Sequence, residues 1–435
     1  MGRGFSDSAI EGNGVLDICR KEGNFLVITK FIRVFAYAFI SIVMPIYLLA
    51  TGYTALFVGI VITITIFASV IFNVIVTLFV GRVGEKKFCI ALALVMALSG
   101  ILFAWNPDIL IFYSKAQMGS LVLDIGRVSP VIILAALLGA ISVTGSETGA
   151  FQSMEQAMLA CETPDSRRTI KFSYYNFFGY LAVSLGSLLP GAVDWLTASR
   201  TDLKLMFFVY SGFALAMALV YFVMPEIRTV TKDDKKFTVS PETRGTVVKL
   251  SLLFSMDSFG GGFVLQSILT LWFKENWGMD IKSLSLLFAV SGIITAFSIF
   301  MAERVARKIG LLNTMVFTHL PSSIFLILIP FAPTVWLAVA LLFARQSISQ
   351  MDVPTRQSYV MAIVKPEDRT AAGALTNIPR TCAQGISPVM ASNMIIGALP
   401  FVLGGGMKIA YDIAIFFTFR KVKPPEEENK PPGCK

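Results

Sequence analysis

The chain contains a series of apolar runs separated by short polar segments. Each run has about 18 residues or more, enough to cross a hydrocarbon core about 30 Å thick as a helix. Lipid cannot satisfy exposed backbone groups, so only helices or closed barrels span membranes, and the short alternating segments of a barrel are absent. Only 15% of the 435 residues are charged, against about 25% in soluble domains. The sequence therefore predicts an all-α membrane protein that crosses the lipid bilayer many times.

The apolar runs indicate twelve transmembrane helices. Their expected spans are 25–50, 54–80, 88–105, 130–160, 170–195, 205–224, 247–273, 283–302, 312–331, 334–362, 371–394 and 398–419. The polar first 24 residues do not resemble a signal peptide.

The basic residues are distributed unevenly between the two sides of these helices. Of 37 Lys and Arg residues, 25 fall in the termini and loops of one side and six on the other. Because cytoplasmic loops are enriched in Lys and Arg, both termini are expected in the cytoplasm, with the chain in the cell membrane. The net charge of +9 is thereby explained by topology, and no nucleic-acid partner is expected.

Two halves of the chain repeat each other. The segment VGRVGEKK around Gly84 parallels VARKIGLL around Gly310, and ACETPDSRRT around Pro164 parallels AIVKPEDRT around Pro366. The offset between copies is 226 residues for the first pair and 202 for the second. A segment present only in the first half, 106–129, accounts for the difference. Repeats of this size determine the fold, and here they predict two six-helix bundles of parallel orientation.

This repeat sets the expected domain organisation. The predicted parts are a cytoplasmic segment 1–24, a first bundle 25–224 with an outer-loop insertion at 106–129, a cytoplasmic linker 225–246, a second bundle 247–419 and a cytoplasmic tail 420–435.

The plan resembles the major facilitator superfamily over nearly the whole chain. The loop Thr77-x-x-x-Gly-Arg-Val-Gly-Glu-Lys-Lys is similar to that family's G-x-x-x-D-R-x-G-R-R signature, with Arg82 retained and Gly81 where the family has Asp. In the family this Asp helps to lock an interface between the halves, so the resemblance implies that this gate is either weaker here or uses other partners. The stretch from DVPTRQSYVMAIV to KVKPPEE is similar to prokaryotic multidrug or sugar-efflux permeases. The absence of an N-x-S/T glycosylation sequence also favours a prokaryotic source.

The resemblance implies that the first, fourth, seventh and tenth helices line a central cavity. Charges inside membranes usually face a cavity or each other. The predicted substrate or proton residues on these helices are Arg33, Tyr37, Glu147, Asp257, Arg345 and Ser349. Arg345, Ser349, Asp352 and Arg356 share one face of a helix because they are spaced by four, three and four residues. The three glycines 260–262 would let the seventh helix bend or unwind.

Each candidate also has a purely structural interpretation. Glu147 and Asp257 are proton-site candidates that would serve equally as salt-bridge partners, and Arg33 is expected to pair with Asp257 across the repeat. A cytoplasmic gate is predicted from Arg82, Glu155, Asp352 and Arg356. Arg380 would either face the cavity or bond a carbonyl group. Lys408 and Asp412 are expected to pair within their helix, and His319 is expected to be inert.

No phosphate-binding G-x-x-x-x-G-K-S/T loop, metal cluster or catalytic pair is present in the sequence, so no enzyme activity, cofactor or metal is predicted. The expected function is secondary active transport of a small organic solute by alternating access, as proton-coupled efflux. An uptake symporter or facilitator on the same fold is the alternative, and a receptor or scaffold is the alternative of another class. The fold does not require more than a monomer.

Overall fold

A computed structural model describes residues 21–107, 111–118, 121–139, 141–145, 149–162, 168–197, 202–227, 239–365 and 368–422. The elements are α1 Lys21–Ala50, α2 Ala55–Val83, α3 Glu85–Trp105, β1 Phe112–Met118, β2 Leu121–Val128, α4 Pro130–Leu137, α5 Ala150–Glu162, α6 Arg168–Leu196, α7 Leu203–Val223, α8 Pro241–Gly262, α9 Gln266–Trp277, α10 Ile281–Ile309, α11 Leu311–Leu328, the 3-10 turn η3 Ile329–Phe331, α12 Val335–Ser349, α13 Asp352–Ile363, α14 Arg369–Asn393 and α15 Leu399–Phe419.

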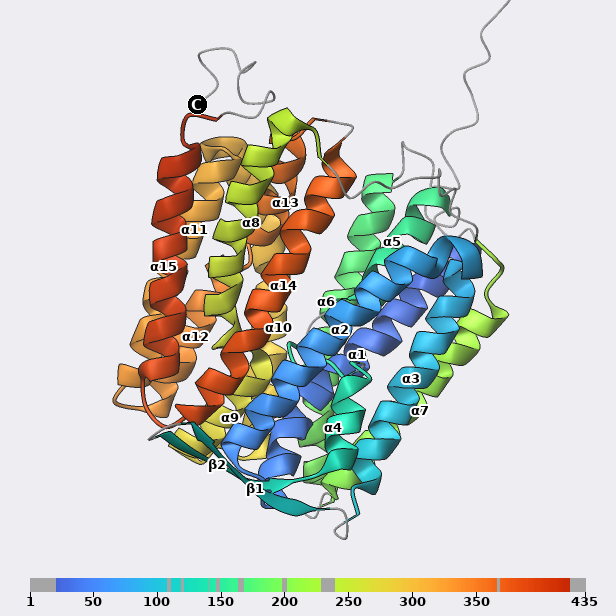
Figure 1. Ribbon diagram of the computed structural model, residues 1–435, viewed down its shortest axis with the longest axis vertical. Helices are drawn as coiled ribbons and strands as arrows, with labels where there is room; N and C mark the ends of the chain where they lie inside the picture. The colour runs from blue at the N-terminus through green and yellow to red at the C-terminus, as the bar shows by residue number, and fades with distance from the viewer. Residues whose placement is uncertain are drawn as a thin grey trace, which may run out of the picture.

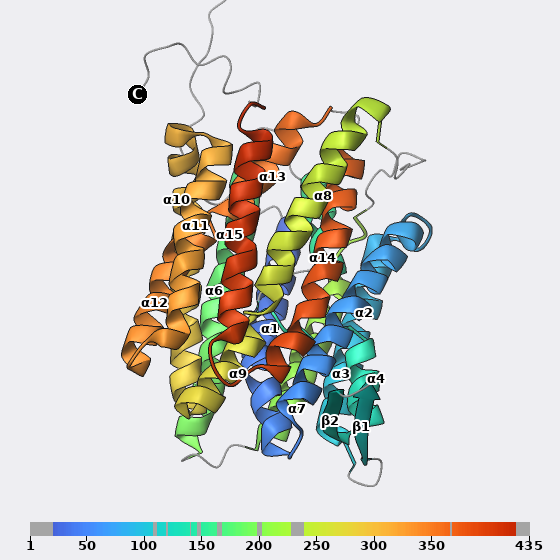
Figure 2. The same ribbon diagram turned by 60° about the vertical axis from the view of Figure 1, so that its left-hand side comes forward.

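The helices form two bundles that lean against each other (Figure 1). The N-terminal half contains α1 to α7 and the C-terminal half α8 to α15. The two halves meet where α2 packs on α14, α6 on α10, and α1 on α9, and Figure 2 shows α14 lying along α2. Six membrane-crossing segments in each half result once the interrupted helices are joined, which confirms the predicted fold class.

Three of the twelve expected helices are interrupted. The fourth, expected to be continuous over 130–160, ends as α4 at Leu137 and resumes as α5 at Ala150. Gly139 and Gly145 lie between them with φ of +60° and +67°, a left-handed conformation that glycine adopts without steric cost. The tenth, expected over 334–362, is broken between α12 and α13. The prediction of continuous helices was wrong at these two places. Glycines with positive φ interrupt the fourth helix, whereas the tenth is broken at Gln350 and Met351, whose backbone stays in the right-handed region; apolar content reveals neither break.

The seventh helix is interrupted where the sequence predicted it. Helix α8 ends at Gly262, and α9 begins at Gln266. These glycines also permit close packing, since a Cβ atom on Gly262 would lie 2.4 Å from the carbonyl oxygen of Gln384, and one on Gly260 would lie 2.7 Å from that of Gly404. The glycine run therefore both ends α8 and brings it against α14 and α15.

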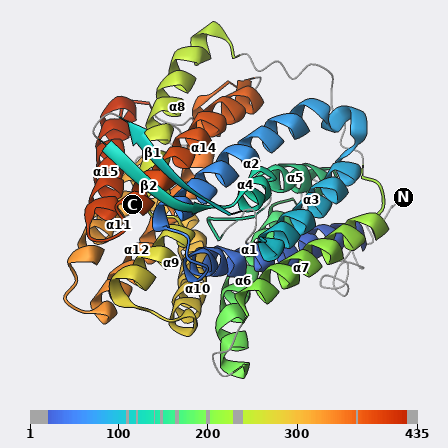
Figure 3. The ribbon, with the colours of Figure 1, turned by 60° about the horizontal axis from the view of Figure 1, so that its bottom comes forward.

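The predicted insertion 106–129 contains an antiparallel hairpin of β1 and β2, with a register irregularity between Ser114 and Lys115. Arg127 Nη1 donates a hydrogen bond to the carbonyl oxygen of Thr51 at 2.7 Å, and Thr54 Oγ1 donates one to that of Ile125 at 2.7 Å. These bonds attach the hairpin to the loop between α1 and α2. Figure 3 shows that it crosses this end of the molecule toward the C-terminal half.

Among the described residues, nine spans are long and apolar enough to cross a membrane. The broken α8–α9 segment counts as one of these spans. The remaining three predicted crossings are the two segments split into α4 with α5 and α12 with α13, and the polar helix α14. Interruption and polarity thus distinguish three of the twelve segments from ordinary transmembrane helices.

The halves are joined tightly in the part nearer the hairpin. A Cβ atom on Gly59 of α2 would lie 1.7 Å from Ser392 Oγ of α14, so α14 leaves no room for a side chain at this position of α2. Ser267 Oγ at the start of α9 donates to the carbonyl oxygen of Ser41 at 2.9 Å. Toward the opposite end, which carries α5 and α13, the two bundles diverge (Figure 1).

Candidate functional site

A buried ion pair lies at the centre of the N-terminal half. Arg33 on α1 binds both carboxylate oxygens of Glu155 on α5, with Nη1–Oε1 at 2.8 Å and Nη2–Oε2 at 2.6 Å, and both side chains are completely buried. Thr29 and Tyr175 also donate to this carboxylate at 2.6 Å each, and Tyr221 donates to its Oε1. Glu155 therefore accepts hydrogen bonds from four side chains on α1, α6 and α7.

Glu155 was predicted for a cytoplasmic gate, and the structure shows which side chains bind it. A gate residue would bind across the two halves near the surface, but the four side chains that bind Glu155 all lie in its own half. Arg33 is further covered by the ring of Phe151, whose centroid is 4.8 Å from Cζ. A buried, paired charge of this kind is costly to break, by about 3–5 kcal/mol, so the pair fixes α1 against α5.

The C-terminal half contains a larger charge cluster around Asp257 of α8. Lys408 Nζ on α15 donates to Asp257 Oδ1 at 2.7 Å, and Arg356 Nη1 on α13 donates to Oδ2 at 3.1 Å. Arg356 also lies 3.1 Å from Asp352 Oδ2, one helical turn earlier. All four side chains are buried. Asp352 and Arg356 were predicted for a gate, but among the described residues their ion pairs lie in the interior of one half.

His319 of α11 extends this cluster and is not the inert residue that we expected. Its Nδ1 lies 2.9 Å from Asp412 Oδ1, and its Nε2 lies 3.6 Å from Asp257 Oδ1 and 3.4 Å from Lys408 Nζ. The predicted pair between Lys408 and Asp412 is therefore wrong, because Lys408 turns to Asp257 and Asp412 turns to His319. Two carboxylates are thus connected through one imidazole.

The two clusters occupy related places in the repeat with their charges exchanged. Arg33 and Asp257 are 224 residues apart, and Glu155 and Arg356 are 201 apart, close to the repeat offsets. In the first half the first helix carries the cation and the fourth the anion, whereas in the second half these signs are reversed. The expected pair between Arg33 and Asp257 is wrong, since each residue finds its partner inside its own half.

Arg345 and Arg380 differ from the other cations inside the C-terminal half. Arg345 on α12 is 8% exposed, and within the described part of the chain its Nε has no hydrogen-bond partner. Its Nη1 donates only a long bond of 3.4 Å to Gln346 Oε1, which Ser349 Oγ also contacts at 3.2 Å. The half-buried Arg380 donates from Nε to Ser258 Oγ at 2.8 Å. Neither guanidinium forms an ion pair with a carboxylate of the described residues.

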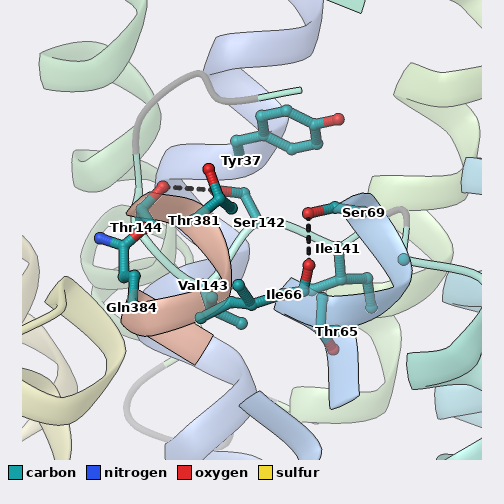
Figure 4. A pocket seen from close by; sticks show the side chains of 11 residues that line it. Tyr37, Thr65, Ile66, Ser69, Ile141, Ser142, Val143, Thr144, Thr381 and Gln384 are labelled. Atoms are coloured by element: carbon teal, nitrogen blue, oxygen red, sulfur yellow. Dashed lines mark hydrogen bonds between the residues drawn. The ribbon is translucent and has the colours of Figure 1, made fainter. Parts of the chain in front are cut away.

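A small cavity lies between the two halves (Figure 4), with a volume of about 30 Å³, room for one or two water molecules. Tyr37 of α1 contributes to it, together with the irregular segment after α4 and with Thr381 and Gln384 of α14. Its remaining lining residues are Thr65, Ile66, Ser69, Gly139, Ile141, Ser142, Val143 and Thr144. Tyr37, which the sequence analysis assigned to a central cavity, thus lines a cavity between the halves.

Arg82 and Glu147 remain of the predicted site residues. Arg82 is exposed at the end of α2, and Glu147 lies outside the described residues. Residues that the prediction missed are Thr29, Tyr175 and Tyr221 in the first half and the linking role of His319 in the second. The role of His319 could have been suspected from the sequence, because a histidine and an aspartate inside apolar helices usually face a cavity or each other.

Comparison with known proteins places the chain in a family. A sequence model of the Major Facilitator Superfamily matches residues 26–257 and 250–435. An uncharacterized membrane protein of Saccharomyces cerevisiae, YJR124C, is 24% identical over 433 residues, covering 89% of this chain and 92% of the yeast protein.

Solved structures of transporters share the fold. The nucleoside transporter NupG superposes with a TM-score of 0.68 at 12% identity and covers 92% of this chain and 99% of its own. A D-xylose–proton symporter gives 0.67 at 16% identity, covering 94% and 99%. The human organic anion transporter MFSD10 gives 0.61 at 13% identity, covering 91% and 99%. At these identities the likeness concerns the fold alone.

Proposed function

The chain belongs to the major facilitator superfamily, and from this premise we propose that it moves a small organic solute by alternating access, coupled to protons. It is a multi-pass membrane transporter and not an enzyme. We place it in the cell membrane with both termini cytoplasmic, following the distribution of its basic residues. A monomer suffices in this proposal because one chain supplies both six-helix halves.

The observation that carries the proton coupling is the cluster around Asp257. A carboxylate inside a membrane protein is costly and is retained where it serves transport. Asp257 contacts Lys408 and Arg356 on two other helices and lies 3.6 Å from His319 on a third. Lys408 and Arg356 favour the charged carboxylate, so in this proposal Asp257 takes up a proton only as these cations move away from it, and its protonation loosens α8 from α13 and α15. Proton binding would then be linked to the packing of this half.

The way the halves meet supports alternating access. The contacts that join them lie in the part nearer the hairpin, including Gly59 with Ser392 and Ser267 with Ser41. With the proposed topology, this conformation faces the cytoplasm. Because the ion pairs of Arg33 with Glu155 and of Asp257 with Arg356 each lie inside one half, rocking one half against the other leaves these buried pairs intact.

The direction that we propose is export in exchange for protons, and it rests on the resemblance of the C-terminal stretch to efflux permeases. Co-transport of the solute with a proton is a second candidate, which one observation favours. Around Asp257, the described part of the C-terminal half places four cations against three carboxylates: Arg345, Arg356, Arg380 and Lys408 against Asp257, Asp352 and Asp412. A site with more cations than carboxylates suits an anionic solute. Binding of the anion would in turn favour the binding of a proton.

The test is the proton change on solute addition, with purified protein in weakly buffered detergent and a panel of organic anions, cations and sugars. We expect at least one solute to release or take up protons, and the Asp257→Asn variant to lose this response. A double variant, Asp257→Asn with Lys408→Met, keeps the buried charge balanced and guards against misfolding. Asp280→Asn, at the surface start of α10, is the control.

The sign of the proton change separates the candidates. Release on binding supports exchange, and uptake supports co-transport. Solute binding without any proton change in wild type would refute the coupling and indicate a facilitator. A proton change that persists in both Asp257 variants would refute the role of Asp257.

A further inference from the structure

Arg345 is a buried cation without a counter-charge in contact with it among the described residues. Its side chain is 8% exposed, and its Nε has no hydrogen-bond partner there. The three carboxylates of the cluster around Asp257 are engaged elsewhere, since Asp352 and Asp257 bind Arg356 and Lys408, and Asp412 binds His319. A buried polar group without a partner costs free energy, and a buried charge costs more. The fold therefore holds a guanidinium at a position where it destabilises the empty protein.

A second arginine lies in the same half. Arg380 on α14 directly precedes Thr381, which lines the cavity between the halves. Its Nε donates to a neutral hydroxyl, that of Ser258. Asp257 and Asp352 act electrostatically on both Arg345 and Arg380, so the two guanidinium groups lie near the same pair of carboxylates. Both arginines consequently belong to the same charged region of the C-terminal half.

We propose that Arg345, assisted by Arg380, binds the acidic group of the transported solute, which is a carboxylate or a phosphate. A guanidinium presents a planar fork of N–H donors that matches such groups with two parallel hydrogen bonds, and Nε is one of the donors available for this. The inference rests on the proposed transport function and narrows its substrate class to organic anions, including zwitterions with an exposed acidic group.

A functional arginine and a structural one differ in a measurable way. If Arg345 is kept for a ligand, replacing it by an apolar residue removes an uncompensated charge from the empty protein. The Arg345→Met variant should then unfold at a higher temperature than wild type in the absence of ligand. A structural role predicts the opposite, a lower unfolding temperature. Arg304→Met, at an exposed position of α10, is the matched control and should leave both the unfolding temperature and the response to ligand unchanged.

The ligand arm uses four probes of similar size: benzoate, phenyl phosphate, neutral benzamide and cationic benzylamine. We expect benzoate, phenyl phosphate or both to raise the unfolding temperature of wild type more than benzamide and benzylamine do. In the Arg345→Met variant this difference between the probes should disappear. The two anions separate a carboxylate site from a phosphate site. Arg345→Lys keeps the charge but loses the fork, and should weaken anion binding about tenfold or more.

Two results would overturn the inference. The first is a lower unfolding temperature of the empty Arg345→Met protein, and the second is wild type that neither anion stabilises more than benzamide and benzylamine. Failure of the transport proposal is distinct. If an anion stabilises the protein without any proton change, the anion site at Arg345 is supported and proton coupling is refuted. If only neutral or cationic solutes cause a proton change, proton coupling is supported and the anion site is refuted.

Discussion

Gly59 tests whether the contact between α2 and α14 is a gate. A methyl group at this position would lie 2.7 Å from the carbonyl oxygen of Pro388 and 1.7 Å from Ser392 Oγ. The serine hydroxyl can rotate away, but Ser392 Cβ, which would also lie 2.7 Å from the new methyl group, and the Pro388 carbonyl oxygen move only with the backbone of α14. Since ordinary contact begins at 3.4 Å, Gly59→Ala must push the two helices apart by ~0.7 Å, the difference between 3.4 and 2.7 Å.

Overpacking of this kind costs about 1–3 kcal/mol in the conformation that suffers it. A conformation in which α2 and α14 separate at this end bears none of that cost. The population should therefore shift toward it by about 5- to 150-fold. Gly212→Ala is the control, since it is also inside a helix and a Cβ atom there meets nothing within 4 Å, so any gain in helix propensity is shared by both variants.

The distance between spin labels measures this shift. Cysteines at Leu196 and Trp336, which are 73% and 80% exposed near the hairpin end of each half, report opening there in a protein whose five native cysteines are replaced. We expect Gly59→Ala to add or enlarge a population at longer distance and Gly212→Ala to leave the distribution unchanged. If the spin-label distance distribution of Gly59→Ala is identical to that of Gly212→Ala, the idea that this contact holds the gate closed is refuted.

Three further variants test the clusters and one helix cap by thermal unfolding. Glu155→Gln leaves Arg33 buried without its counter-charge and should lower the free energy of unfolding by about 3–5 kcal/mol; an effect below about 1 kcal/mol would contradict the paired geometry. His319→Ala deprives Asp412 of its partner and should cost about 1–3 kcal/mol, whereas no loss would mean that the imidazole is not holding that carboxylate. Asp280 caps α10, and hydrogen bonds from the Ser283 side chain and backbone lower its pKa. Asp280→Ala should therefore destabilise by about 0.5–2 kcal/mol above the usual carboxyl pKa, with the difference from wild type fading as the pH falls below about 4; a difference that persists in acid would exclude the charged cap.

The membrane fold followed from the sequence because it depends on composition and repetition. Apolar runs of sufficient length, a repeated glycine and proline pattern, and the loop charges together predict two six-helix halves. The same reasoning failed at Gly139 and Gly145, whose positive φ angles interrupt the helix inside an apolar segment. It succeeded at the three glycines 260–262, since their number alone signals a break.

The partners of the buried charges could not be predicted from spacing. Arg33 and Asp257 are oppositely charged and nearly equivalent in the repeat, which made a pair between the halves plausible. The structure instead brings Arg33 to Glu155, because α5 starts anew after the interruption of the fourth helix and lies against α1. Lys408 likewise shares a helix with Asp412, yet tertiary packing places Asp257 within its reach. Pairing is set by helix rotation, which hydrophobic patterning alone leaves undetermined.

The most direct test of proton-coupled transport is solute accumulation in vesicles under an imposed pH gradient. Wild type and the Asp257→Asn, Lys408→Met double variant would be reconstituted, and uptake of a labelled solute that wild type binds would be followed with the interior acidic and then with the exterior acidic. We predict accumulation above equilibrium under one of the two gradients, its loss on adding a protonophore, and its absence in the double variant. An acidic interior would drive exchange, and an acidic exterior would drive co-transport. Uptake that merely equilibrates under both gradients would contradict the central claim.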